Sequence, residues 1–373
     1  MERAERHQSS LHAGRPLRRG WTTGTCAAAA TRAAYEALLT GAFPDPVAVQ
    51  LPSGAHPSFA LAISEHGPDF ARAGIVKDAG DDPDVTHGAL IVSTVRLAAA
   101  GSGVVFRAGE GVGTVTRPGL PLPPGEPAIN PVPREMIRTA IAEVAAQHGG
   151  SSDVVVELSI PGGEKLAERT LNGRLGIVGG LSILGTTGIV VPYSCSAWIH
   201  SIHRGIDVAR AAGLDHVAGA TGATSEAAIA RLHGLPETAL IDMGDFVGGM
   251  LKYLRRHPVP FVTVAGGMAK MTKLGQGLLD LHSRRGEVDL HWLSQAATEM
   301  GGDAELAGRI AGSNSAMEAF GHAREADINL SAGVAAAAWR TAVQALGGGM
   351  RLEIVIFDRS GRLLARTETG AVH

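Results

Sequence analysis

Aspartates crowd one short segment in the first quarter of the chain. The segment KDAGDDPDVTHG contains Lys77, Asp78, Asp81, Asp82, Asp84 and His87. Carboxylates this close together can bind a hard cation, tune one another's pKa values for proton transfer, or cap turns through their side chains. Their spacing is not that of an EF-hand calcium loop, and the residues alone leave these three alternatives open.

A glycine turn near the middle of the chain has the spacing of a phosphate-binding loop. The segment GLSILGTT matches G-x-x-x-x-G, but Thr186 and Thr187 stand where such a loop has Lys followed by Ser or Thr. A glycine turn that follows a strand and places hydroxyls at a helix start suits a nucleotide-like ligand, and the alternative is a packing feature. The dinucleotide motif G-x-G-x-x-G is absent.

A proline-rich loop and two lysines supply further candidates. The segment PPGEPAINPVPR holds Glu126, Asn130 and Arg134 among prolines, and such stiffness serves either a site or a plain connection. Lys270 and Lys273 follow a later glycine turn. They would bring positive charge to a ligand, unless they belong to a solvated helix surface.

The remaining side chains favour structural interpretations. His200 and His203 stand three residues apart and could offer two ligands to a metal, but no third ligand is in view, so no metal site is predicted. Cys26 lies near a predicted helix start and is expected to be a small buried thiol. Motifs of serine hydrolases, zinc proteases and kinases are absent.

The composition narrows the class of protein. The 373 residues carry a net charge of −3 and are 45% hydrophobic, which argues against a nucleic-acid or membrane-surface protein. Two cysteines exclude a disulfide scaffold and favour the cytoplasm. The 50 glycines predict many tight turns and close backbone approaches. The uncharged stretch 175–202 contains glycines and Pro192, so it predicts a buried strand and a turn, not a membrane span.

The first half predicts an α+β domain with a mixed or antiparallel sheet. Helices are expected over 22–41, capped by Thr22, Thr23 or Thr25 and ended by Gly41, and from Pro133 to residue 148. A glycine-kinked hairpin is expected over 103–119. Strands are expected over 47–54, 58–67, 70–80, 88–98 and 153–163.

The second half predicts a Rossmann-like, doubly wound parallel sheet. Four segments read as a strand, a glycine-containing turn and a helix, namely 174–188, 215–234, 237–256 and 260–283. We therefore expect a flexible tail over 1–15, an α+β domain over 16–173 and a Rossmann-like α/β domain over 174–345. A C-terminal hairpin over 346–373 would complete one sheet or the other. The turns after the parallel strands should meet at one edge of the sheet.

Five motifs, in order, resemble the CbiD family, the cobalt-precorrin-5B C1-methyltransferases of the anaerobic route to vitamin B12. They are LRRGWTTGTCAAAA, VKDAGDDPDVTHGA, GEGVGTVTRPGLPLPPGEPAINPVPREMI, NGRLGIVGGLSILGTTGIVVPYS, and MGDFVG with the following GGMAKMTKLGQG. The resemblance covers about residues 16 to 360.

The resemblance implies a cytoplasmic enzyme that transfers the methyl group of S-adenosylmethionine to carbon 1 of cobalt-precorrin-5B, giving cobalt-precorrin-6A. Cobalt then arrives within the substrate. Methyl transfer from a sulfonium needs alignment more than a protein nucleophile, which agrees with the missing catalytic motifs. The rivals are a non-catalytic corrinoid-binding or carrier protein, and a phosphate-transferring enzyme that the missing loop lysine disfavours. Homo-oligomer formation stays open.

The resemblance also suggests roles for the candidate residues. Asp78, Asp81 or His87 could remove or relay a proton as charge redistributes around the ring, and the alternative is a proton transfer that does not involve the protein. The expected donor-binding residues are Gly179, Gly180, Gly185, Thr186, Thr187, Gly188, Asp242 and Asp245. The expected substrate-binding residues are Lys77, Arg117, Glu126, Asn130, Arg134, Lys270 and Lys273. One departure stands out, because the second half lacks the usual glycine-rich motif of nucleotide-binding sheets with an acidic residue ending the second strand.

Overall fold

An alanine-rich helix forms the centre of the first half of the protein. Helix α2 (Thr23–Thr40) begins where the Thr22 hydroxyl accepts the N–H of Thr25, and it ends at Gly41 in the left-handed conformation. Its alanines are almost all buried, because small side chains let the helix pack closely on its neighbours. The predicted helix over 22–41 is therefore confirmed.

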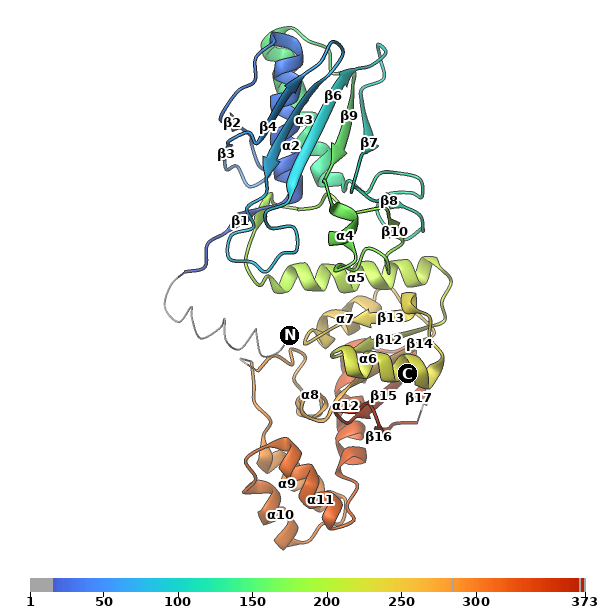
Figure 1. The fold of residues 1–373 in the computed structure, drawn as a ribbon. Coiled ribbons are helices and arrows are strands. Elements are labelled where there is room, and N and C mark those ends of the chain that lie inside the picture. The colour runs from blue at the N-terminus through green and yellow to red at the C-terminus, as the bar shows by residue number, and fades with distance from the viewer. Residues whose placement is uncertain (1–15, 284, 369, 372–373) are drawn as a thin grey trace. The chain divides into compact units, whose positions relative to one another are not determined.

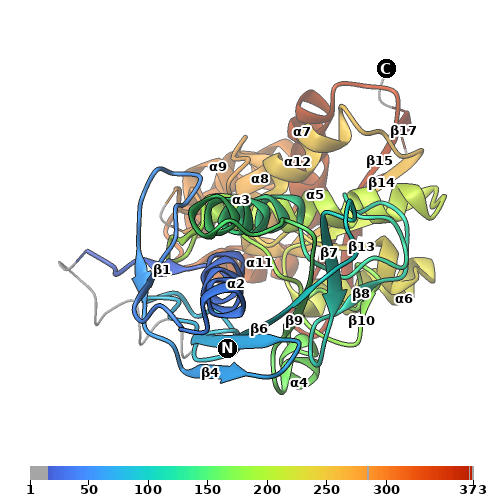
Figure 2. The same cartoon turned by 90° about the horizontal axis from the view of Figure 1, so that it is seen from above.

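A five-stranded mixed sheet supports this helix. The strand order is β4-β5-β6-β9-β7, with all neighbours antiparallel except β7 and β9. Helix α2 packs on β5 and β6. Helix α3 packs against α2 (Figure 2). The bounds are β4 (Ile63–His66), β5 (Ala71–Val76), β6 (Leu90–Leu97), β7 (Val104–Ala108), β9 (Val154–Ser159) and α3 (Pro131–His148).

Helices α2 and α3 run parallel, so their N-termini lie at the same end. A Cβ at Gly24 would lie 2.7 Å from Pro133 Cγ, while at the other end the Tyr35 hydroxyl donates to the carbonyl of Ser151. Helix α3 begins at Pro131, two residues before the expected start, because Asn130 takes the extended conformation of an N-cap residue.

Short strand pairs correct two expectations for this half. The predicted hairpin over 103–119 is wrong, because β7 pairs with β9 and β8 pairs with β10. Segment 174–188 does not open the second sheet, because β10 and β11 pair with strands of the first half. The remaining elements are β1 (Gly20–Trp21), β2 (Val47–Ala48), β3 (Ser58–Phe59), β8 (Thr114–Val115), β10 (Ile177–Val178), β11 (Ile189–Val190) and α4 (Gly163–Ala167).

The chain divides into two compact units between Ser194 and Cys195 (Figure 1). This computed structural model describes residues 16–283, 285–368 and 370–371. The expected boundary after residue 173 falls too early, since the pairing of β10 and β11 keeps the following segment in the first unit. The expected tail, residues 1–15, lies outside the described residues.

The second unit contains a parallel sheet with an antiparallel margin. The strand order is β13-β12-β14-β15-β16; the first four strands are parallel, and β16 and β17 are antiparallel to β15. Three of the four predicted strand-turn-helix segments are confirmed, and the C-terminal hairpin completes this sheet. The strands are β12 (His216–Ala220), β13 (Leu240–Asp242), β14 (Phe261–Gly267), β15 (Arg351–Phe357), β16 (Leu363–Arg366) and β17 (Gly370–Ala371).

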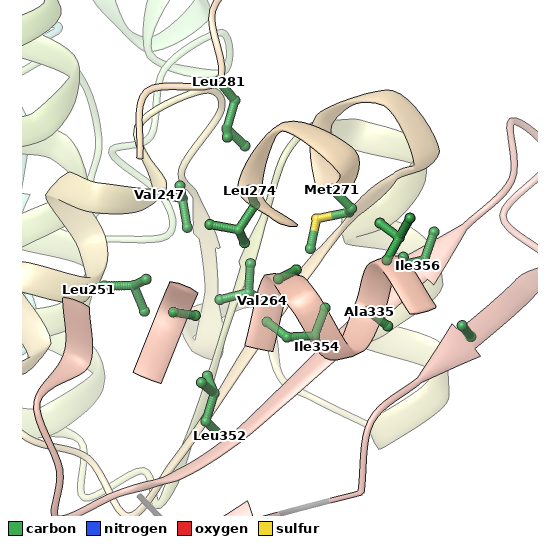
Figure 3. Close-up of a cluster of buried hydrophobic side chains, with 14 of the residues drawn as sticks. Val247, Leu251, Val264, Met271, Leu274, Leu281, Ala335, Leu352, Ile354 and Ile356 are labelled. Atoms are coloured by element: carbon green, nitrogen blue, oxygen red, sulfur yellow. The ribbon is translucent and has the colours of Figure 1, made fainter. Parts of the chain in front are cut away.

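Helices pack on both faces of this sheet. Residues of α5, α7, α8 and α12 share the larger core with one face, which Figure 3 shows around Val264, Met271 and Ile354. On the other face, Ala228 and Ile229 of α6 pack against strand residues. The helices are α5 (Cys195–Ala211), α6 (Ala223–His233), the 3-10 turn η1 (Glu237–Ala239), α7 (Val247–Leu254), α8 (Met268–Gly275), α9 (Leu290–Glu299), α10 (Ala304–Ala311), α11 (Ala316–Glu325) and α12 (Leu330–Leu346).

Candidate functional site

Four segments meet at the end of the first unit where α2 and α3 begin. We call this region the loop end, and it comprises residues 18–25, 77–88, 110–134 and 177–193. Backbone hydrogen bonds join Trp21 to Asp78, and Thr22 to Gly188. A Cβ at Gly20 would lie 2.0 Å from the carbonyl carbon of Ala79, so glycine is required for the close approach of these segments. The loop end thus gathers most of the candidate residues.

A buried ion pair anchors the aspartate-rich loop. Lys77 is 1% exposed, and its Nζ donates to Asp84 Oδ2 at 2.6 Å. Asp84 also accepts from the N–H and the hydroxyl of Thr86. Burial raises the pKa of Asp84, but the Lys77 charge and these hydrogen bonds outweigh it and lower the pKa overall. Lys77 is therefore committed to its loop, which argues against its expected role on a substrate.

Arg18 binds Asp78 and Asp81, the two aspartates that were expected to be catalytic. Its guanidinium donates to both carboxylate oxygens of Asp78, and its backbone N–H donates to Asp81 Oδ2 at 2.6 Å. The hydrogen bond from Arg18 is the main reason that the pKa of Asp78 falls to about 2. Such a carboxylate is a weak base at neutral pH. The sequence analysis missed Arg18, although the motif LRRGWTTG contains it.

His87 is the more exposed acid–base candidate. Its side chain is 53% exposed, and its Nδ1 accepts the N–H of Ala79 at 3.1 Å. In the neutral imidazole this bond places the proton on Nε2. The Asp78 carboxylate lies 3.8 Å from Nδ1.

Asp82 joins the aspartate-rich loop to the end of the glycine segment. Its Oδ1 accepts the N–H of Tyr193 at 2.8 Å. Burial is the main reason that the pKa of Asp82 is raised. Tyr193 has a positive φ of 56° and a 55% exposed side chain, and the sequence analysis missed it.

Much of the glycine segment packs closely against other residues of the first unit. No helix follows it directly, because β11 comes next and α5 begins only at Cys195. A Cβ at Gly180 would lie 2.2 Å from the Gly111 carbonyl oxygen, and one at Gly185 would lie 2.3 Å from Thr22 Oγ1. The Thr25 hydroxyl donates to the carbonyl of Gly188 at 2.7 Å.

The other members of the glycine segment face outward. Thr186, Thr187 and Gly179 are exposed, and Gly179 has a positive φ of 87°. The Thr187 hydroxyl bonds to the backbone of Ile189 in a local turn. Packing therefore accounts for Gly180, Gly185 and Gly188 of the expected donor-binding residues. The side chains of Thr186 and Thr187 lie at the surface.

Arg134 holds the proline-rich loop in shape. Its guanidinium donates to Glu126 Oε2 at 2.8 Å and to the carbonyls of Ile129 and Pro127, and it stacks over Phe106. Only 13% of the Arg134 side chain is exposed, so its guanidinium holds Glu126 in place and has little contact with solvent.

Two further substrate candidates at this end differ in their environment. Asn130 precedes α3, and its side chain makes no capping hydrogen bond. Arg117 is exposed, and its stem lies over Gly176. Both side chains can therefore meet a ligand without giving up a described structural role.

Four candidates lie in the second unit. Lys270 Nζ donates to the carbonyl of Thr221 at 2.8 Å and lies 3.2 Å from Asp245 Oδ1, as an ion pair without hydrogen-bond geometry. Asp242 ends β13. Lys273 is 8% exposed and donates to the carbonyl of Leu281, so neither the ligand role nor the solvated surface predicted for it fits. The expected donor-binding set therefore divides between the two units.

The remaining candidates have structural surroundings. Cys26 is buried, and burial raises its pKa to about 12. The His203 ring stacks on Tyr253 with centroids 3.9 Å apart. Within residues 16–283, 285–368 and 370–371, no three His, Cys, Asp or Glu side chains are grouped to hold a metal. In the same part of the chain, every helix is too short or too polar to cross a membrane.

These features define a class of protein. It has two α/β units, one with a rigid polar loop end and the other with glycine turns at the carboxyl edge of a parallel sheet. Turns and loops of this kind can position a ligand through backbone and polar side chains.

Comparison with known proteins identifies the family. The CbiD model matches residues 10–192, and the model "CbiD, C-terminal domain" matches residues 280–368. The chain belongs to the CbiD family. A Bradyrhizobium protein named cobalt-precorrin-5B C(1)-methyltransferase is 66% identical, with 96% of both chains covered. An Agrobacterium fabrum protein of the same name is 65% identical, covering 96% of this chain and 95% of the relative.

A solved structure also matches. It is the cobalamin biosynthesis protein cbiD from Archaeoglobus fulgidus, with 27% identity and a TM-score of 0.39. The match covers 72% of this chain and 83% of that one.

Proposed function

We propose that this protein methylates carbon 1 of cobalt-precorrin-5B, giving cobalt-precorrin-6A in cobalamin biosynthesis, with S-adenosylmethionine as the methyl donor. The observation that carries the proposal is 58 to 66% identity over nearly the whole chain to relatives that bear this enzyme name. The carrier alternative is not favoured, because these relatives are named as enzymes. The cytoplasm is the expected compartment, and the second unit is expected to act as a Rossmann-like, doubly wound domain.

Methyl transfer requires that the donor and the ring carbon are aligned and that water is excluded. The bond between the sulfonium and its methyl group breaks as the new bond to carbon 1 forms, and the donor leaves as a neutral thioether. Because the reactivity lies in the sulfonium and in the ring carbon, the protein contributes by fixing the two reactants in line. A rigid loop end, built on a buried ion pair and proline-restricted backbone, serves such positioning.

The residues of the loop end divide into binding and positioning roles. Arg117 and Asn130 are proposed to meet the macrocycle, Arg117 through a peripheral carboxylate. Lys77 and Arg134 are positioning residues, since both are occupied inside the protein. Glu126, held by Arg134, stays a candidate for a polar contact with substrate.

A hydrogen bond to the substrate falls most naturally to His87. Its ring is half exposed and its Nε2–H lies away from the Ala79 bond, whereas the Asp78 and Asp81 carboxylates are occupied by Arg18. We expect His87→Phe to slow methyl transfer about 10-fold, because the variant has no donor at this position. The same variant should unfold at the temperature of the wild type, because the ring packs little.

The experiment uses cobalt-precorrin-5B and S-adenosylmethionine carrying a trideuterated methyl group, incubated anaerobically with the purified protein. The proposal predicts that the tetrapyrrole gains one labelled methyl group, detected by mass spectrometry. Tetrapyrrole that binds but gains no label would instead support the carrier alternative. The Agrobacterium fabrum relative that bears this enzyme name is incubated in parallel.

A further inference from the structure

Three glycine-containing turns lie side by side at the carboxyl edge of the second unit's sheet. Strand register places Ala220 of β12 next to Asp242 of β13 on one side and next to Ala265 of β14 on the other. The backbone N–H of Thr221 donates to the carbonyl of Ala265, and that of Gly244 donates to the carbonyl of Ala220. The turns that follow these three strands therefore share one edge.

The strand order makes this edge a topological switch point. After β12 the chain passes through α6 to β13 on one side, and it then returns to β14 on the other side of β12. In open α/β sheets, ligands bind where neighbouring connections diverge in this way, outside the carboxyl ends of the strands.

The βαβ unit formed by β12, α6 and β13 carries part of what the sequence analysis found missing. Gly222 stands at the turn into α6, and Asp242 is the last residue of β13. An acidic residue about 20 positions after the glycine turn holds ribose hydroxyls in dinucleotide-binding units. The acidic residue at the end of the second strand is therefore present, whereas the full glycine-rich motif stays absent.

At two of these positions, the N-caps of α6 and α8, neither close packing nor backbone strain requires glycine. Gly222 has extended backbone with φ of 164°, Gly267 has φ of −80°, and a Cβ at either would meet nothing within 4 Å. Gly180 and Gly185 of the first unit differ, because protein atoms fill the space of their missing side chains. Open space beside an unstrained glycine is what close approach of a ligand to backbone requires.

We propose that S-adenosylmethionine binds at this edge of the second unit, over Gly222 and Gly267, with Asp242 accepting hydrogen bonds from its ribose hydroxyls. This site replaces the expected one on residues 179–188 and rests on the proposed function. Lys270, which already bridges Thr221 and Asp245 at this edge, ties the turns after β12 and β14 together.

The test measures binding of S-adenosylmethionine to the full chain by calorimetry, with and without cobalt-precorrin-5B. Gly222→Val adds a side chain where a Cβ would meet no protein atom within 4 Å, and Asp242→Asn removes the charged acceptor. Gly173→Val is the matched control, since Gly173 lies in the first unit and a Cβ there also meets nothing within 4 Å. Thr186→Val combined with Thr187→Val tests the competing location.

The proposed site predicts that Gly222→Val and Asp242→Asn weaken binding by about 10- to 100-fold at an unchanged melting temperature. The Gly173 and threonine variants should bind like the wild type. If the threonine variant loses binding and Gly222→Val retains it, the location is overturned. Methyl transfer by the wild type is measured in parallel. A wrong location leaves the wild type able to bind the donor and transfer the methyl group. If the proposed function is wrong, the wild type does neither.

Discussion

Replacing Lys77 by methionine tests whether the buried ion pair holds the loop end together. The change leaves the Asp84 carboxylate, whose side chain is 23% exposed, without its cation. Breaking a buried pair by removing one partner typically costs about 3 to 5 kcal/mol. Asp84 keeps two hydrogen bonds from Thr86 and some solvent, so we expect the lower end of this range, about 3 kcal/mol.

Native-state hydrogen exchange followed by mass spectrometry measures this loss within the first unit. Peptides that cover β5 and β6 should exchange roughly 100-fold faster in Lys77→Met, which corresponds to about 3 kcal/mol. Peptides from β12 and β14 serve as the internal control, because these strands belong to the other unit.

A pH series supplies the second half of this test. Because the folded pKa of Asp84 is lowered, its stabilisation is present above the unfolded pKa of about 3.9 and is lost as pH falls through the folded value. The variant should show less of this acid-dependent loss than the wild type. A change below about 0.5 kcal/mol in the opening free energy at pH 7 would refute the reasoning, because ordinary surface substitutions stay within that limit.

Other predictions concern packing and titration. Gly20→Ala should lower the melting temperature measurably, because the added Cβ would lie 2.0 Å from the Ala79 backbone; a melting curve like that of the wild type would contradict the required close approach. Burial lowers the pKa of His216 to about 4, so the free energy of unfolding should fall as pH drops from about 6.5 to 4. In urea titrations, the free energy of unfolding of His216→Gln should depend less on pH over this range than that of the wild type. The same pH dependence in both proteins would contradict the prediction. Iodoacetamide at pH 8 should modify exposed Cys195 and leave buried Cys26 unmodified in peptide maps, since burial raises the Cys26 pKa to about 12.

Local signals made much of the fold predictable. Thr22, Gly41 and the alanine run are sufficient to define α2, because capping and helix propensity act within a few residues. The strand-turn-helix rhythm likewise predicted β12, β13 and β14 with their helices. Such features depend on neighbours in sequence.

Long-range pairing was not predictable in this way. The two-residue strands β10 and β11 carry no periodicity of their own, and their partners β8 and β1 lie far away in sequence. Segment 174–188 was therefore predicted to be a buried strand of the second sheet. In the structure it belongs to the first unit, where the backbone of Gly180 lies against that of Gly111. Residue type alone also did not reveal that Lys273 is buried or that Arg18 occupies Asp78.

The most direct test of the central claim locates the transferred carbon. Cobalt-precorrin-5B is incubated anaerobically with the protein and S-adenosylmethionine carrying a carbon-13 methyl group, and the isolated tetrapyrrole is examined by carbon-13 NMR. The account predicts one enriched methyl signal, correlated with carbon 1 of the macrocycle. Enrichment at another ring carbon, or an unlabelled tetrapyrrole from protein that binds both reactants, would contradict it.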